Sequence, residues 1–253
     1  MQPDTKQRKP AMEVRDLFFS YGKNKVLKGT SFAIEEGKIT TIMGANGCGK
    51  STLFNLMTKN LCPRKGNIFL HGKNIQNLGL KDFAKRVSIV HQYNSSADDI
   101  TVERLVSFGR TPHRKMMQGH SDEDEKLIRR AMEVTNVLKY RDREVSRLSG
   151  GQRQRVWIAM ALAQNTKILF LDEPTTYLDI RYQVEILELV KKLNQEYGIT
   201  IIMVLHDINQ DPLLRPDHRP ERLTGGGSWG AGGGDHRGMH PGIVRDLPGS
   251  DGY

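Results

Sequence analysis

The chain has 253 residues, enough for one large domain, or a domain with a small subdomain, around a real hydrophobic core. Its net charge of +9 indicates an anionic partner such as a nucleotide, a nucleic acid or a membrane face, although a solvated lysine-rich surface explains the charge equally well. Two cysteines, Cys48 and Cys62, exclude a disulfide framework and favour a reducing compartment. No apolar run approaches the roughly 18 residues that span a bilayer, and the N-terminus lacks the apolar region of a secretory signal.

The first part of the chain predicts a layer of strands followed by a helix. Residues 12–42 alternate short apolar runs with turns, which is typical of an antiparallel or mixed sheet, and they end in the buried strand KITTIM. A helix is predicted from Lys50 to about Asn60, and further strands near 67–70 and 87–90.

The second part predicts helices and buried strands in alternation. Residues 101–140 have a helical pattern, and ILFLDEP at 168–174 is typical of a buried parallel strand. An amphipathic helix over 181–197 stops at Gly198, and TIIMVLHD at 200–207 predicts another buried strand. The pattern therefore predicts an α/β sheet with an inserted helical subdomain at about 95–150.

A phosphate-binding loop is predicted directly after the KITTIM strand. GANGCGKS at 44–51 matches G-x-x-x-x-G-K-[ST] between a strand and a helix. Its glycines let backbone N–H groups curl around phosphate oxygens at the positive end of the helix. Lys50 would reach the outer phosphates of a nucleotide, and the Ser51 hydroxyl would bind Mg²⁺. The predicted nucleotide-binding residues are Gly44, Ala45, Asn46, Gly47, Cys48, Gly49, Lys50, Ser51 and Thr52.

Two further segments carry chemistry. Asp172, at the end of the ILFLDEP strand, is expected to hold Mg²⁺, and the adjacent Glu173 is placed to orient and polarise an attacking water. LSGGQRQR at 148–155 puts a serine and two glycines before an amphipathic helix, which is typical of an anion-binding helix N-terminus. The sequence thus predicts a second anion site in a chain that already has one.

Together these segments resemble the ATP-binding subunit of an ABC transporter over about residues 12–210, and LSGGQ at 148–152 is that family's own signature. The resemblance implies a P-loop NTPase core of RecA-like type with an N-terminal antiparallel β layer. It also implies a homodimer whose two chains pair head to tail. The second anion site would then cap the ATP held by the other chain, through Ser149, Gly150, Gly151 and Gln152.

The resemblance implies roles for further residues. Tyr21 would stack on adenine, and Gln92 would contact Mg²⁺ and couple the site to the membrane subunit. Asp179 would communicate across the dimer, and His206 would hydrogen-bond the terminal phosphate, so that Lys50, Gln92, Glu173 and His206 form the catalytic set. His91 stands where the family usually has proline.

EPTTYLDI, VSFGRTPH and LHDINQ resemble, more narrowly, importers of iron-siderophores, haem and cobalamin, with iron-siderophore uptake favoured. This implies ATP and Mg²⁺ as cofactors, permease subunits and a substrate-binding protein as partners, and a peripheral place on the cytoplasmic face of the membrane. A haem or cobalamin importer remains an alternative, as does a soluble ABC ATPase of iron–sulfur assembly or of the nucleic-acid type. The single cassette, without a coiled-coil or zinc insertion, argues against a nucleic-acid partner.

Residues 211–253 have a different character. Lysine is absent, glycine and proline are concentrated, and no amphipathic period survives, which predicts an irregular tail. Read one nucleotide later with permissible codons, DPLLRPD hides Thr-Arg-Tyr-Ser-Asp and MHPG hides Cys-Thr-Pro-Glu, and both resemble the family's C-terminal region. A frameshifted reading is therefore favoured over a native flexible tail. It would leave the sheet near 200–205 without cover.

Overall fold

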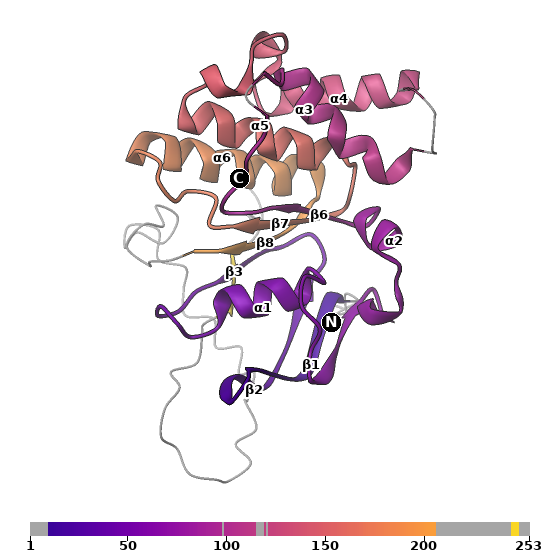
Figure 1. The fold of residues 1–253 in the computed structure, drawn as a ribbon, viewed down its shortest axis with the longest axis vertical. Coiled ribbons are helices and arrows are strands. Elements are labelled where there is room, and N and C mark those ends of the chain that lie inside the picture. The colour runs from indigo at the N-terminus through magenta and orange to yellow at the C-terminus, as the bar shows by residue number, and fades with distance from the viewer. Residues whose placement is uncertain (1–9, 98, 115–118, 120, 206–243, 248–253) are drawn as a thin grey trace, which may run out of the picture.

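The computed structural model describes residues 10–97, 99–114, 119, 121–205 and the backbone of 244–247. Two β-sheets and a layer of helices make up this part of the chain (Figure 1). The predicted strands over 12–42 are confirmed, and they divide between the two sheets.

The N-terminal sheet is antiparallel throughout and has the order β2-β1-β4-β5. Its two long strands form a hairpin, and the strand predicted near 67–70 lies beside them as β4. The close approach of β4 to β1 requires Gly66, because a Cβ there would lie 2.2 Å from the carbonyl oxygen of Asp16. The strands are β1 (Pro10–Tyr21), β2 (Asn24–Glu35), β4 (Lys65–Leu70) and β5 (Lys73–Asn74).

The core sheet has the order β6-β7-β8-β3-β9. The first four strands are parallel and β9 is antiparallel to β3. Their continuous apolar runs fit a sheet that is covered on both faces, and every residue of β3 and β8 is buried. The strands are β6 (Val87–Val90), β7 (Ile168–Asp172), β8 (Thr200–Val204), β3 (Ile39–Ile42) and β9 (Val244–Leu247).

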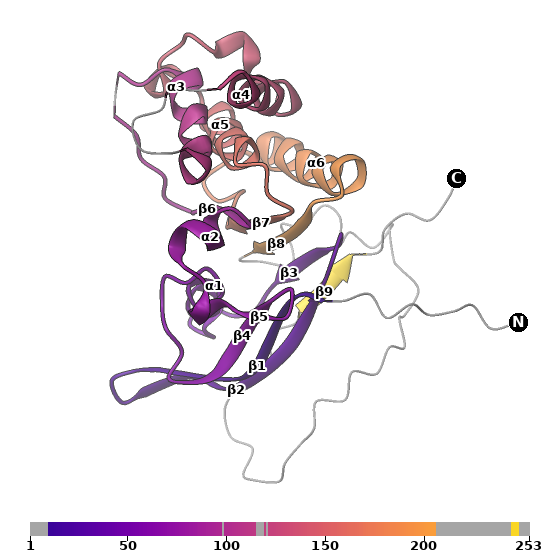
Figure 2. The ribbon, with the colours of Figure 1, turned by 90° about the vertical axis from the view of Figure 1, so that its right-hand side faces the viewer.

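More helices pack on one face of the core sheet than on the other (Figure 2). One cluster of buried side chains packs α1 between the core sheet and the N-terminal sheet. The other cluster packs α3, α4, α5 and α6 on the opposite face. The α-helices are α1 (Lys50–Met57), α2 (Leu80–Ala84), α3 (Val102–Ser107), α4 (Asp122–Val134), α5 (Gly150–Ala163) and α6 (Ile180–Tyr197).

Helix boundaries follow local chemistry. Helix α1 ends at Met57, three residues earlier than the predicted Asn60, and the Thr58 hydroxyl that follows donates to the carbonyl of Phe54. Helix α6 stops at Gly198, as predicted, because that residue takes a left-handed φ of 62°. The helical region predicted over 101–140 is divided into α3, a 3₁₀ segment (Phe108–His113) and α4.

Four residues of the tail that was expected to be irregular form β9, which pairs with the outer edge of β3 from Ile42↔Val244 to Ile39↔Leu247. The other residues of 206–253 lie outside the described residues. The expectation that the sheet near 200–205 lacks cover is wrong, because Leu205 and every residue of β8 are buried. The side chains of β8 alternate between the two buried clusters.

Candidate functional site

The carboxyl ends of the parallel strands meet at one edge of the core sheet. Asp172 and Ile42 both lie opposite Val204 of the central strand, and Val90 lies opposite Leu171. This register puts the loop after β3, the loop after β6 and the end of β7 next to one another. The predicted phosphate-binding loop, Gln92 and the acids Asp172 and Glu173 therefore converge at one edge, as ligand sites of open α/β sheets usually do.

The loop between β3 and α1 has the shape that its sequence predicts. Gly47 and Gly49 take positive φ values of 79° and 100°, which favour glycine. A Cβ at Gly49 would also lie 2.8 Å from Cγ1 of Val26, so the β1–β2 hairpin packs against this loop. Ala45, Asn46 and Gly47 are exposed and accessible to a ligand.

Lys50 is buried in this loop, with 7% of its surface exposed. Its Nζ donates to the carbonyl of Gly44 at 2.7 Å and to that of Ala45 at 3.1 Å. An ammonium group held at the start of a curled, glycine-rich loop is placed to meet phosphate oxygens. Its position agrees with the predicted phosphate contact.

Glu173 is held in place through both its backbone and its side chain. It is buried, with 6% of its surface exposed, and takes a left-handed φ of 49°. Its Oε2 accepts hydrogen bonds from the Gln92 Nε2 and from the Thr176 hydroxyl, the latter at 3.2 Å. The backbone N–H of Glu173 donates to the carbonyl of Val204 at 3.1 Å, which fixes the turn to the central strand.

A second contact joins the Gln92 loop to the segment after Glu173. The hydroxyls of Tyr93 and Tyr177 lie 2.9 Å apart, and both rings are exposed. This hydrogen bond raises the pKa of Tyr93. Sequence patterns did not find Thr176, Tyr93 or Tyr177, and the available signal was their nearness in sequence to Glu173 and Gln92.

His91, where the resemblance implied a proline, packs edge-on against Phe54 with ring centroids 6.2 Å apart. Burial lowers the pKa of His91, which favours its neutral imidazole. The residue therefore supports the Gln92 loop by packing against α1.

The signature forms the N-terminus of α5. Ser149 caps the helix reciprocally with Gln152, and the Gln152 Nε2 donates to the Tyr140 hydroxyl at 3.1 Å. Ser149 and Gly150 are exposed, whereas Gly151 is buried. Because α5 and α1 pack on opposite faces of the core sheet, the signature and the helix of the phosphate-binding loop belong to different layers.

The remaining predicted residues lie at element ends. Tyr21 ends β1 with 53% of its surface exposed and meets the Phe19 ring edge-on at 4.9 Å. Asp179 is exposed and stands at the N-cap of α6. His206 lies outside the described residues.

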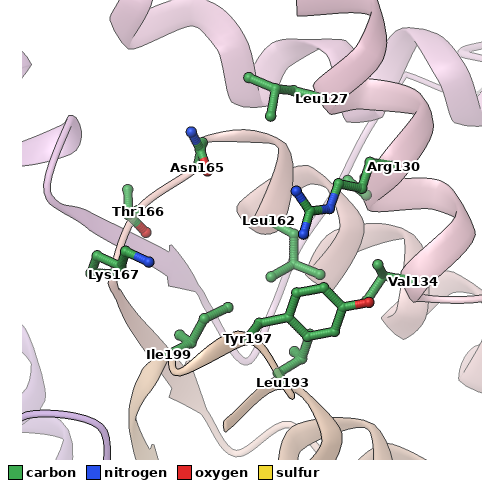
Figure 3. Close-up of a pocket in the computed structure, with 11 residues that line it drawn as sticks. Leu127, Arg130, Val134, Leu162, Asn165, Thr166, Lys167, Leu193, Tyr197 and Ile199 are labelled. Carbon is green, nitrogen blue, oxygen red and sulfur yellow. The ribbon is translucent and has the colours of Figure 1, made fainter. Parts of the chain in front are cut away.

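A cavity lies at the other end of the core sheet, near the starts of β7 and β8 (Figure 3). It contains none of the predicted site residues. Its lining includes Leu127, Arg130, Leu162, Lys167, Tyr197 and Ile199.

The described residues contain no group of three or more His, Cys, Asp or Glu side chains that could hold a metal. They also contain no helix that is long and apolar enough to cross a membrane.

Comparison with known proteins identifies the family. A family model for ABC transporters matches residues 27–176, which include Lys50, Gln92, the signature and Glu173. The chain is 46% identical over 199 residues to the iron(3+)-hydroxamate import ATP-binding protein FhuC of Bacillus subtilis (strain 168), covering 79% of this chain and 74% of that protein. It is 45% identical over 194 residues to the ferric enterobactin transport ATP-binding protein FepC of Escherichia coli (strain K12), covering 77% and 72%.

Solved structures agree with this fold. The chain aligns with a metal-chelate-type ABC transporter in an inward-facing conformation at a TM-score of 0.70 and 31% identity, over 80% of this chain and 75% of that one. A dimeric bacterial ABC transporter cassette gives a TM-score of 0.66 and 30% identity, over 79% and 89%. The P-loop ATPase fold with an N-terminal antiparallel sheet is thereby confirmed. The chain belongs to the ABC transporter family, as an ATP-binding subunit that hydrolyses ATP.

Proposed function

We propose that this ATPase energises the import of iron-siderophore complexes through a membrane permease, from the cytoplasmic face of the membrane. The observation that carries the proposal is the identity of 46% and 45% to proteins named for ferric hydroxamate and ferric enterobactin transport. A third relative, 45% identical, is named for petrobactin import. A substrate-binding protein would deliver the complex to the permease.

The residues at the sheet edge have different roles in phosphoryl transfer. Lys50 and the N–H groups of the phosphate-binding loop would hold the phosphates of ATP. Ser51 and Asp172 fit Mg²⁺, because this ion prefers oxygen ligands and takes most of them from phosphates and water rather than from a protein cage. Bound Mg²⁺ would supply charge neutralisation on the phosphates, with Gln92 as a further ligand.

Glu173 is the proposed group that orients the attacking water and accepts its proton. Its carboxylate is already held by Gln92 and Thr176, which leaves it little freedom to turn away. Such positioning is the main contribution that a protein makes to phosphoryl transfer. His206 would contact the terminal phosphate, and Tyr21 would stack on adenine.

We further propose a head-to-tail homodimer in which each ATP lies between one chain's Lys50 loop and the other chain's signature, with Asp179 communicating across the interface. Exposed Ser149 and Gly150, together with the separation of α5 and α1 on opposite faces of the sheet, support this pairing. The likeness to a dimeric cassette supports it as well.

The cargo is tested by uptake of labelled iron in cells that lack the gene and carry either this chain or its Lys50→Ala variant. Ferric hydroxamate uptake should return with the chain and not with the variant. Restored haem or cobalamin uptake without ferric siderophore uptake would replace the proposed cargo with the alternative one. Failure to associate with any permease would favour a soluble ABC ATPase.

The pairing is tested by mixing a Ser149→Arg chain with a Lys50→Ala chain. Lys50→Ala should weaken ATP binding, because a buried cation that meets the phosphates is lost. A mixed dimer places both changes in one composite site and keeps the other intact, so the mixture should hydrolyse ATP faster than either variant alone. A mixture no faster than its components contradicts the head-to-tail arrangement.

A further inference from the structure

The second glycine of the signature is constrained from inside its own chain. Ser149 and Gly150 are exposed at the start of α5, and Gly151 is buried. Exposed residues are open to a nucleotide on a partner. A buried glycine instead points to a side chain of the same chain that occupies the space a Cβ would need.

That side chain is Tyr182, in the first turn of α6. A Cβ at Gly151 would lie 2.5 Å from Cδ1, 2.7 Å from Cγ and 3.1 Å from Cβ of Tyr182. Carbon atoms pack at about 3.5–4.0 Å, so alanine at 151 requires the two helices to separate by about 1 Å. The neighbouring Gly150 differs, because a Cβ there meets only Cδ2 of Leu178 at 3.3 Å, which a small side-chain adjustment relieves.

A second link, one turn further along both helices, holds them at this distance. The Arg155 Nη2 lies 2.9 Å from the Glu185 Oε2, and the Arg155 Nη1 donates to the carbonyl of Thr135. Both charged side chains are partly buried, with 19% and 30% of their surfaces exposed. Moving α5 away from α6 at Gly151 would therefore strain an ion pair as well as the Tyr182 contact.

Helix α6 continues directly from the segment that holds Glu173. Asp179 is the N-cap, and the Gln183 Nε2 donates back to the carbonyl of Leu178 at 2.8 Å, which ties the segment to the first turn of α6. Tyr182 therefore stands between the catalytic segment of the chain and its own signature. Two of the three Tyr182 atoms that a Cβ at residue 151 would meet, Cδ1 and Cγ, belong to the ring, so the ring is the part that acts.

We propose that Tyr182 is a positioning residue that sets the signature helix relative to the catalytic segment, and that position 151 must be glycine because of the Tyr182 ring. The alternative explanation for this glycine is close approach of the partner's nucleotide. The two explanations predict different results when the ring is removed.

The test is a second-site rescue measured on the full chain. Gly151→Ala should lower the ATPase kcat at least about tenfold, because a shift of 1 Å in a positioned group can cost about 10²-fold. Gly151→Ala with Tyr182→Ala should recover at least several-fold of that loss, incompletely because the Cβ of residue 182 remains. Gly150→Ala with and without Tyr182→Ala is the matched control, in which removing the ring should give no recovery.

Thermal unfolding and ATP binding are measured on each variant to separate folding from positioning. A folded double variant without recovery overturns the proposal and favours the nucleotide as the cause. Wild-type kcat in Gly151→Ala alone also overturns it. If the double variant does not fold, the single variants at residue 182 test the positioning role. Tyr182→Phe should retain the wild-type kcat and Tyr182→Ala should lower it, and the affinity for ATP should be unchanged in both. Equal kcat in Tyr182→Ala and wild type contradicts a positioning role.

Discussion

Glu173 occupies a backbone conformation that the sequence alone does not reveal. A non-glycine residue at a φ of 49° costs about 1–2 kcal/mol, and the surrounding bonds to Val204, Gln92 and Thr176 maintain it. Strain of this kind is found where a side chain must point in a direction that an unstrained turn would not allow. Here it directs a carboxylate to the Gln92 loop beside the phosphate-binding loop.

Replacing Glu173 with Gln should leave ATP binding intact and lower hydrolysis by at least about 100-fold, since an amide cannot accept the proton of the attacking water. The variant should accumulate as an ATP-bound dimer. Size-exclusion chromatography with ATP and a phosphate-release assay measure both effects. Glu188→Gln makes the same chemical change on the exposed face of α6 and should behave as wild type. If Glu173→Gln hydrolyses ATP at near the wild-type rate, another residue accepts the proton of the attacking water.

At the residue scale, motif spacing predicted the positions of residues that are neighbours in sequence, and the roles assigned to those residues stay predictions. Lys50, Asp172 and Glu173 follow from short segments that lie at strand ends. Thr176 and the Tyr93–Tyr177 pair depend on how two loops meet in space, which no periodicity encodes. The buried state of Gly151 likewise depends on Tyr182 of α6, which is far from it in sequence.

At the scale of elements, hydrophobic period predicted the strands and the long helices, because buried faces repeat with the period of the element. Helix α6 and strand β6 match their predicted ranges within a residue or two. The region between α3 and α4 was predicted less well. Arg110 interrupts the apolar pattern there, and yet it is buried with 6% of its surface exposed.

The ion pair between Arg110 and Asp124 explains this burial. Its Nε and Oδ1 atoms lie 2.7 Å apart, and Arg110 also donates to the carbonyl of Ala163 at 2.8 Å, so it joins the 3₁₀ segment to α4 and α5. Burial alone would raise the pKa of Asp124, but hydrogen bonds from Arg110 and Ser121 outweigh burial and lower it from 3.8 to about 2. The carboxylate is thus strongly preferred in the folded chain.

Asp124→Asn should lower the free energy of unfolding by about 2 kcal/mol or more at pH 7, since one pKa unit is worth about 1.4 kcal/mol and Arg110 loses its partner. A lowered pKa contributes stability above the unfolded value of 3.8, and this is lost as pH falls toward 2. The difference between variant and wild type in urea unfolding should therefore narrow from pH 5 to pH 3. Glu133→Gln, in the exposed pair with Arg129, is the control and should change stability by less than about 0.5 kcal/mol. A difference independent of pH would contradict this account.

At the scale of the whole molecule, α1 sits between two sheets and carries the phosphate-binding loop, while the signature begins the helical layer on the other face. Alternation of strands and helices predicted this α/β organisation. The pairing of strands far apart in sequence, such as β3 with β8, could not be read from local pattern. The chain spans 74% of FhuC and 72% of FepC, and the aligned part covers 79% and 77% of this chain.

Residues 211–253 differ in composition from the rest of the chain, because lysine is absent and glycine and proline are concentrated there. We expect the gene, read one nucleotide later after the LHDINQ codons, to encode an amphipathic terminal helix that contains Cys-Thr-Pro-Glu in place of MHPG. The reason for this expectation is the sequence of the tail, which has no lysine and no amphipathic period. The nucleotide sequence is the measurement. An early stop codon, or no amphipathic pattern in that frame, rules the frameshift out.

If the frame is restored by one inserted or deleted nucleotide, the product should unfold at a higher temperature and aggregate less than this chain, because the restored segment buries apolar surface. Equal unfolding temperatures of the two chains would mean that the restored segment adds no stability beyond the pairing of the short strand β9 with β3.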